Sequence, residues 1–161
     1  MFKIKNKTIF NLILLFSVFA LITAYFIQYV LKHQPCNLCL IERIPYFFSI
    51  IVTSIYLFTT KFEKLSLIIL SLIFFSATLI AFYHFGIEQE FIKESVVCNL
   101  NNENNNLSKE ALLNQLKTMP VSCKDVTFKI FGLSLATFNI FISLIFGVIT
   151  MKLFLTYEKN R

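Results

Sequence analysis

Long apolar runs, separated by short polar segments, dominate the pattern of this chain. Four of them contain no Asp, Glu, Lys or Arg: Thr8–Leu31, Ile44–Thr60, Leu65–Tyr83 and Ile130–Met151. Each run approaches or exceeds the roughly 17–25 residues that a helix needs to cross a bilayer. Because the runs are continuous and do not alternate, they predict helices and not the strands of a membrane barrel.

We therefore expect an all-α integral membrane protein, a four-transmembrane-helix bundle in one domain of residues 1–161. The expected helices cover about residues 9–31, 43–60, 65–83 and 130–151. The composition agrees, since 57% of the residues are hydrophobic, 15% are charged and Phe occurs 20 times. A water-soluble domain of 161 residues could not bury that much apolar surface.

The charge pattern predicts how the helices are oriented. The net charge of +6 could suit nucleic acid, but the basic residues flank the apolar runs instead of forming one stripe. Eight Lys or Arg crowd into residues 1–7, 61–64 and 152–161. This density places both termini in the cytoplasm and the loops 32–42 and 84–129 on the other side of the membrane, which we expect to be the periplasmic side of a bacterial inner membrane. The first run is too long for a signal peptide, so we expect an uncleaved anchor.

All four cysteines fall in the two predicted periplasmic loops. Cys36 and Cys39 lie in the first loop, and Cys98 and Cys123 lie in the second. In the second loop, Ser108 also predicts the start of a short helix over about Lys109–Lys117. A periplasmic position favours disulfides over free thiols.

The segment Pro35-Cys36-Asn37-Leu38-Cys39 has a spacing that suits either a small disulfide ring or a metal site. Leu40 follows the second cysteine, where a c-type haem site requires His. Two structural disulfides, or one zinc site with four cysteine ligands, remain open from spacing alone. A disulfide across so short a loop stabilises little, however, so a redox-active pair is favoured.

The residues after this pair strengthen the redox interpretation. Cys39 is expected near the N-terminus of the second helix, where unpaired N–H groups favour a thiolate. Arg43 follows four residues later and would share a helical face with Cys39, adding a fixed positive charge. Pro45 limits how early the regular helix can begin. The alternative is that Glu42 and Arg43 only anchor the helix at the membrane interface.

At this point the sequence resembles the DsbB family of disulfide bond formation proteins. The resemblance rests on the four predicted helices, Pro35-Cys36-x-x-Cys39, Glu42-Arg43, and a separate cysteine pair in the second loop. Two further segments are similar to the family: Tyr83-His84-Phe85-Gly86-Ile87-Glu88 and Gly132-Leu133-Ser134-Leu135-Ala136-Thr137-Phe138-Asn139.

The resemblance implies a quinone-dependent thiol oxidase that reoxidises a DsbA-like periplasmic dithiol protein. It implies the disulfides Cys36–Cys39 and Cys98–Cys123, with Cys98 taking the mixed disulfide with the partner and Cys123 resolving it. Electrons would then reach Cys36–Cys39, and Cys39 would reduce ubiquinone or menaquinone.

Further residues correspond to the quinone pocket of the family. Arg43 would stabilise the Cys39 thiolate and the charge that develops on a quinone oxygen. Gln28, His84 and Glu42 match other positions of that pocket. A polar side chain inside a span is costly enough to suggest a function. The alternatives are that Gln28 only packs between helices and that His84 is an interfacial histidine without a task.

Three rival functions stay open. One is a relative that oxidises a dedicated partner. Another is the vitamin K epoxide reductase type, although there the quinone-side cysteines lie near the last helix. The third is a non-catalytic scaffold with structural disulfides or a zinc site built from the four cysteines; the leading interpretation includes no metal. The second loop is rich in Asn, and the chain has no Trp, which leaves Phe and Tyr to line any quinone site.

Overall fold

The computed structural model describes residues 2–59, 62–93, 123–124, 129–130 and 133–159. The long helices are α1 (Phe2–Tyr29), α3 (Ile44–Thr59), α4 (Glu63–Glu88) and α6 (Leu135–Lys159). A short helix, α2 (Asn37–Ile41), precedes α3, and two short strands, β1 (Lys129–Ile130) and β2 (Leu133–Ser134), precede α6. Cys98 and the predicted helix at residues 109–117 lie outside the described residues.

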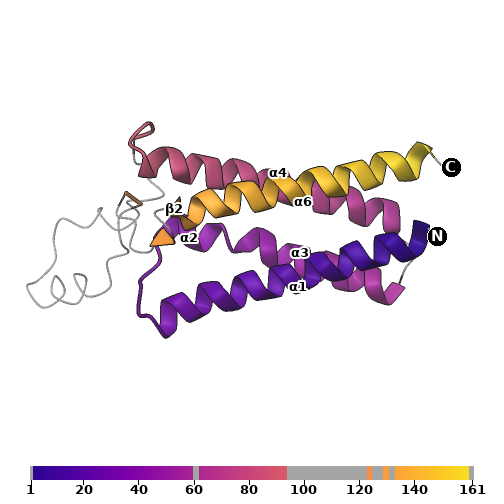
Figure 1. Ribbon diagram of the computed structural model, residues 1–161, viewed down its shortest axis with the longest axis horizontal. Coiled ribbons are helices and arrows are strands. Elements are labelled where there is room, and N and C mark those ends of the chain that lie inside the picture. The colour runs from indigo at the N-terminus through magenta and orange to yellow at the C-terminus, as the bar shows by residue number, and fades with distance from the viewer. Residues whose placement is uncertain (1, 60–61, 94–122, 125–128, 131–132, 160–161) are drawn as a thin grey trace, which may run out of the picture.

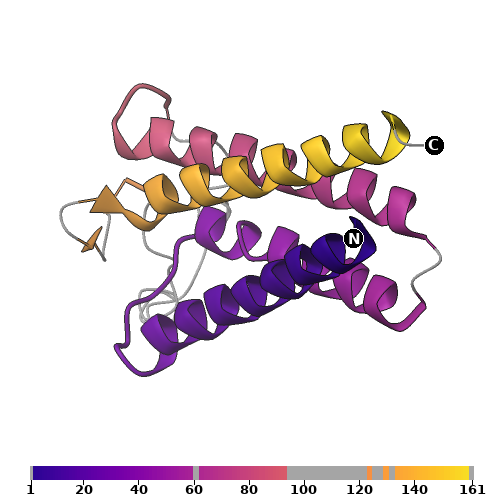
Figure 2. The ribbon, with the colours of Figure 1, turned by 45° about the vertical axis from the view of Figure 1, so that its right-hand side comes forward.

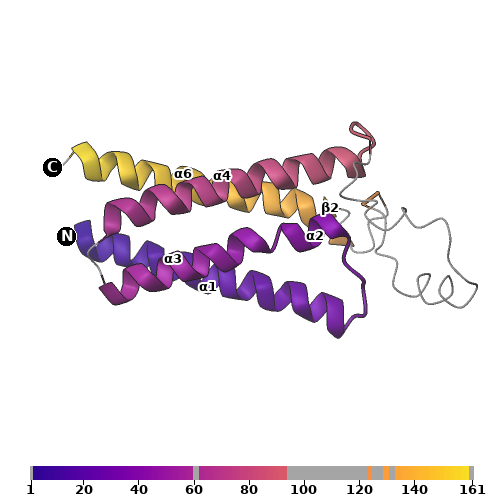
Figure 3. The same ribbon diagram turned by 180° about the vertical axis from the view of Figure 1, so that it is seen from behind.

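The four long helices run side by side, with both termini at one end of the bundle and α2 and β2 at the other (Figures 1 and 3). Among the described residues, four helical segments are long and apolar enough to cross a membrane. The predicted bundle of four membrane-spanning helices is therefore confirmed, and the described structure is nearly all helical.

Several helix bounds differ from those expected from the apolar runs. The third span continues beyond Tyr83 to Glu88, so His84 lies on a helix and not in a loop. The last span begins at Leu135 and not at Ile130, because Lys129–Ile130 and Leu133–Ser134 pair as short antiparallel strands, with Lys129 opposite Ser134. The Ser134 hydroxyl then accepts a hydrogen bond from the Thr137 N–H (3.3 Å) and caps the helix.

The second span is broken into two helices at Glu42 and Arg43. α2 ends at Ile41 and α3 begins at Ile44, with Pro45 in its first turn. Proline lacks the N–H that would continue the α2 ladder, so the regular hydrogen bonds of α3 start with the N–H groups of Tyr46 and Phe47 on the Arg43 carbonyl. This break decides where the two charged side chains point.

The helices pack in pairs, with α6 along α4 and α1 along α3, while α3 also contacts α4 (Figure 2). Aromatic side chains fill the interior. Phe10 stacks on Tyr56 with 3.8 Å between ring centroids, and Phe74 contacts Phe146 at 5.3 Å. Large apolar side chains also cover the outside, such as Phe58, which is 90% exposed. An apolar exterior over a packed interior is the arrangement that lipid requires.

We predict that a Phe74→Ala change destabilises the bundle. The Phe74 side chain is fully buried between α4 and α6, so its removal leaves a cavity and should cost roughly 2–4 kcal/mol. Leu79→Ala is the matched control on the same helix, because Leu79 is 71% exposed. Reversible unfolding in mixed micelles measures both; equal stability of the two variants would contradict the described packing.

Candidate redox site

A disulfide joins Cys36 and Cys39 at the end of the bundle that lies opposite the termini. Cys36 is the N-cap residue of α2, and its sulfur accepts a hydrogen bond from the Cys39 N–H (3.1 Å). The sequence placed the helix N-terminus beside Cys39. In the structure the Cys39 N–H donates its hydrogen bond to the Cys36 sulfur.

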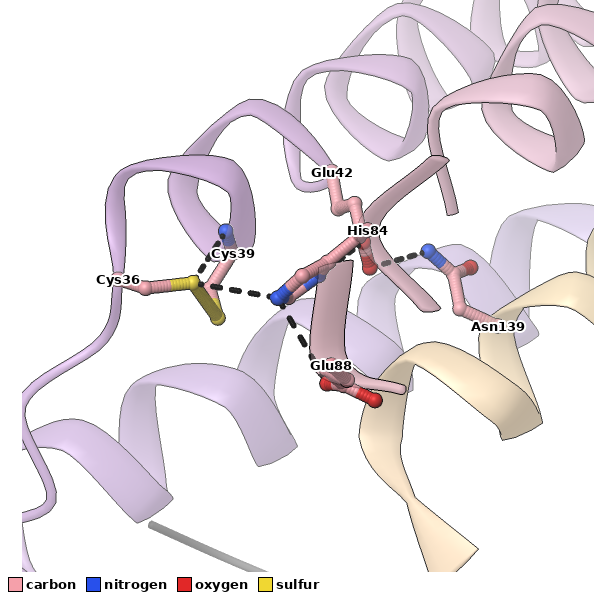
Figure 4. Close-up of a disulfide and its surroundings, with 6 residues drawn as sticks. All are labelled: Cys36, Cys39, Glu42, His84, Glu88 and Asn139. Carbon is pink, nitrogen blue, oxygen red and sulfur yellow. Dashed lines mark hydrogen bonds and ion pairs between the residues drawn. A yellow bond between two sulfur atoms is a disulfide. The ribbon is translucent and has the colours of Figure 1, made fainter. Parts of the chain in front are cut away.

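His84 lies against this disulfide, as Figure 4 shows. Its Nε2 is 3.5 Å from the Cys36 Sγ, and the side chain is buried. The contact exists because α4 continues past Tyr83 and carries the imidazole up to α2. An imidazole nitrogen at this distance from a sulfur is placed to give a proton to a thiolate or to take one from a thiol.

Glu42 holds the other side of the imidazole. Its Oε1 lies 2.7 Å from His84 Nδ1, and its Oε2 accepts a hydrogen bond of 2.7 Å from Asn139 Nδ2. A carboxylate only accepts, so the pairing places the Nδ1 hydrogen toward Glu42 and leaves Nε2 of the neutral ring facing the sulfur. The residue thus fixes both the orientation and the tautomer of His84.

Asn139 extends the network into α6. Its Oδ1 accepts hydrogen bonds from the Tyr46 hydroxyl and from Ser143 Oγ (3.1 Å). Burying polar groups is costly unless they are paired, and here Glu42, between α2 and α3, links His84 of α4 to Asn139 of α6, which in turn pairs with Tyr46 of α3. The result is a continuous buried chain of contacts from the Cys36 sulfur to Tyr46.

Glu88 contributes a second carboxylate on the sulfur side. Its Oε1 lies 3.6 Å from His84 Nε2, one helical turn further along α4, and its side chain is only 5% exposed. His84 therefore has one carboxylate at each ring nitrogen.

Arg43 contacts a different group of residues from its neighbour Glu42. Its guanidinium donates to Gln28 Oε1 (2.6 Å) and lies over the Tyr25 ring, 5.0 Å from the centroid. The residue follows the end of α2, so Cys39 and Arg43 do not lie in one regular helix. The predicted pocket residues thus make two sets of contacts: Arg43 contacts Gln28 and Tyr25 on α1, and Glu42 contacts His84 beside the Cys36 sulfur.

Cys123 lies in the same buried cluster as Cys36. Leu38 and Ile87 complete this cluster, and Cys39 packs against it. Cys123 is only 2% exposed. One cysteine of the second loop is therefore brought to the first pair, although many residues separate them in the sequence.

Comparison with known proteins agrees with this arrangement. Residues 6–153 match the family described as "Disulfide bond formation protein DsbB". The chain belongs to the DsbB family. Membership implies a role as a disulfide oxidoreductase in disulfide bond formation, and members of the DsbB family are associated with quinones. With its four apolar helices, this DsbB-family chain is a multi-pass membrane protein.

A relative in Rickettsia prowazekii (strain Madrid E), the "Uncharacterized protein RP370", is 28% identical over 155 residues. The match covers 94% of this chain and 90% of that protein. No solved structure matches the chain.

Sequence reasoning about this DsbB-family chain missed four residues of the site: Tyr46, Glu88, Asn139 and Ser143. A signal for Asn139 was present, since an amide inside an apolar run is costly unless it is paired. The same argument had singled out Gln28. No comparable signal marked Tyr46, because tyrosine is common near membrane interfaces.

Proposed function

We propose that this DsbB-family protein is a quinone-dependent thiol oxidase that reoxidises a DsbA-like dithiol protein in the periplasm. The observation that supports this function best is the Cys36–Cys39 disulfide at the mouth of the bundle, with His84 against one sulfur and Cys123 in the same cluster. The dense positive charge near both termini supports a cytoplasmic position for the opposite end.

The partner is oxidised at the second cysteine pair. Its dithiol attacks a Cys98–Cys123 disulfide at Cys98, and the partner leaves as a disulfide. Two electrons and two protons then remain on Cys98 and Cys123. This step is proposed from the family resemblance, since Cys98 lies outside the described residues.

Electrons next pass from Cys123 to the first pair. A Cys123 thiolate attacks the Cys36 sulfur, forms a Cys36–Cys123 bond and releases the Cys39 thiolate. The shared buried cluster of Cys36 and Cys123 supports this direction of attack. Cys98 later attacks Cys123, which restores the second disulfide and frees Cys36 as a thiol.

His84 is placed to manage the proton of Cys36 in this exchange. The Nε2 atom, 3.5 Å from the Cys36 sulfur, first takes up the proton that is released when Cys123 becomes a thiolate. The imidazolium then protonates Cys36 as it leaves Cys123, and Nε2 removes that proton when the first disulfide forms again. Glu42 keeps the ring in position through its 2.7 Å contact with Nδ1. That Glu42 and His84 also touch the quinone stays a prediction.

Gln28 and Arg43 fit a quinone. A quinone is a neutral ring with carbonyl oxygens, and it needs hydrogen-bond donors within apolar surroundings. The partly buried guanidinium offers such donors, and its bond to Gln28 Oε1 turns the amide so that its NH₂ group remains available. The Tyr25 ring adds a planar surface beside the guanidinium. When bound, ubiquinone or menaquinone supplies the two-electron oxidant that returns the cysteines to the disulfide.

Turnover of the purified protein tests this function. The full-length chain in detergent is mixed with a reduced DsbA-type protein and ubiquinone-1, and the quinone absorbance is followed. We expect turnover in the wild-type protein and its loss in Cys36→Ser and Cys98→Ser variants. Normal quinone reduction without the first cysteine pair would refute the proposal, and so would a wild-type protein that reduces no quinone with active DsbA-type partner present.

We predict that Arg43→Ala lowers kcat/KM for ubiquinone-1 by about 10- to 100-fold, because a fixed positive charge and several donors are lost. Arg43→Lys should restore only part of the loss, since an ammonium cannot donate in a planar fork. Initial rates over a range of quinone concentrations measure the effect. The rate of exchange with the DsbA-type protein is the internal control and should be unchanged; a loss confined to that exchange would contradict the assignment.

A further inference from the structure

The disulfide end of the bundle gathers the ligand types that zinc prefers. The two sulfurs of Cys36 and Cys39 and the Nε2 of His84 all lie within 4.8 Å of one another. Glu88 Oε1 lies 3.6 Å from the same nitrogen, and Figure 4 shows these side chains converging from α2 and α4. Thiolate, imidazole and carboxylate are the three ligand classes of zinc sites in proteins.

The spacing of these atoms suits a tetrahedral ion. Zinc lies about 2.3 Å from a thiolate and about 2.0 Å from an imidazole nitrogen, so two such ligands are about 3.5 Å apart. The distance from Cys36 Sγ to His84 Nε2 is 3.5 Å. The two cysteines would have to separate their sulfurs, and the C-x-x-C spacing is the one that zinc knuckles use for this purpose.

The surroundings of His84 favour a metal at Nε2. In protein zinc sites the second nitrogen of the ligating histidine commonly donates to a carboxylate, which fixes the ring. Here Glu42 accepts from Nδ1 at 2.7 Å and is itself held by Asn139 at 2.7 Å. Cys36, His84 and the Glu88 side chain are each about 5% exposed, whereas Cys39 is partly exposed.

We propose that the reduced form of this protein binds one Zn²⁺ through Cys36, Cys39 and His84, with Glu88 as the nearest carboxylate for the fourth position, and that the disulfide form has no such site. Reduction of the disulfide takes two electrons and two protons from a dithiol, which becomes a disulfide. Zinc then displaces the two thiol protons without changing its own oxidation state. Bound zinc holds both sulfurs as ligands, so they cannot form the disulfide again until the metal leaves. The resulting inhibition of turnover rests on the proposed function, but the metal site does not.

The test measures metal binding directly. The full-length chain carries Cys98→Ser and Cys123→Ser, so that one cysteine pair remains. It is reduced with a phosphine, freed of reductant without oxygen and titrated with Co²⁺, whose thiolate charge-transfer absorption reports sulfur ligands. Zn²⁺ then displaces the cobalt and is counted per chain. We expect one metal per reduced chain and none per oxidised chain.

Variants show which side chains bind the metal. Cys36→Ser should abolish the charge-transfer band, and His84→Ala and Glu42→Gln should each weaken binding by about 10- to 100-fold. His33→Ala is the matched control and should bind as tightly as the parent. Unchanged binding in His84→Ala, or no binding by the reduced parent, would overturn the site.

The metal titration uses neither quinone nor partner protein, so its result is separate from that of the turnover assay. If the chain binds zinc but reduces no quinone, the metal site is supported and the proposed function is refuted. If both hold, zinc added to the turnover assay should stop quinone reduction, and a chelator should restore it. Undiminished turnover at zinc concentrations that saturate the reduced chain would refute the inhibitory role.

Discussion

Replacing Cys39 with serine should abolish quinone reduction, with a loss of about a thousandfold or more. A hydroxyl cannot accept or return the electrons that a sulfur exchanges, so the first pair no longer forms a disulfide. Cys36 keeps its thiol, however, and lies in the same buried cluster as Cys123. The variant should therefore accumulate a Cys36–Cys123 disulfide after oxidation.

Mass spectrometry of peptides from the non-reduced variant measures this bond. Cys36→Ser is the matched counterpart, because it should lose turnover to the same extent and yet form no bond between position 36 and Cys123. A Cys39→Ser protein with an ordinary rate would contradict the electron path. The electron path would also be contradicted if Cys123 formed disulfides in this variant but never one with Cys36.

The second large effect concerns stability, and it should follow from Glu42→Leu. The carboxylate accepts from His84 Nδ1 and from Asn139 Nδ2, and both contacts are buried. An apolar side chain of similar size would leave two donors without an acceptor in a low-dielectric interior. Each costs about 1–3 kcal/mol, so the bundle should lose roughly 2–5 kcal/mol.

Reversible unfolding in mixed micelles measures this loss. Glu90→Gln is the control, because the Glu90 side chain is 75% exposed and lies 3.8 Å from Lys124, a surface pair that contributes under about 1 kcal/mol. Glu42→Gln keeps an acceptor and should lose less stability than Glu42→Leu. If Glu42→Leu unfolds like the wild-type protein, the buried network does not stabilise the bundle.

Much of the fold could be predicted from hydrophobicity, because lipid demands long apolar helices and the chain has four runs of that kind. The ends of the helices could not be predicted in this way. A helix continues wherever its backbone hydrogen bonds do, and α4 carries His84 and Glu88 past the apolar run. Conversely, Ile130 is apolar and was expected to begin the last helix, but it lies in the short strand β1.

The residue types that form the site could be predicted, but not which of these residues contact one another. The spacing of Cys36 and Cys39 is local, and the resemblance to the DsbB family supplied candidate residues. The contacts of Glu42 with His84 and Asn139 join three elements that lie far apart in the sequence, and no local pattern encodes such a contact. Glu42 and Arg43 are adjacent, yet the break between α2 and α3 sends one toward α4 and α6 and the other toward α1.

The proposed function depends most on the side of the membrane that the first cysteine pair faces. In intact cells that express a Cys98→Ser, Cys123→Ser chain, the pair is reduced and treated with a maleimide that does not cross the inner membrane. We predict that Cys36 and Cys39 are labelled from the periplasm in intact cells. The extent of labelling should be the same when the cells are lysed before the maleimide is added. Labelling that occurs only after lysis would place these sulfurs in the cytoplasm and contradict a periplasmic thiol oxidase.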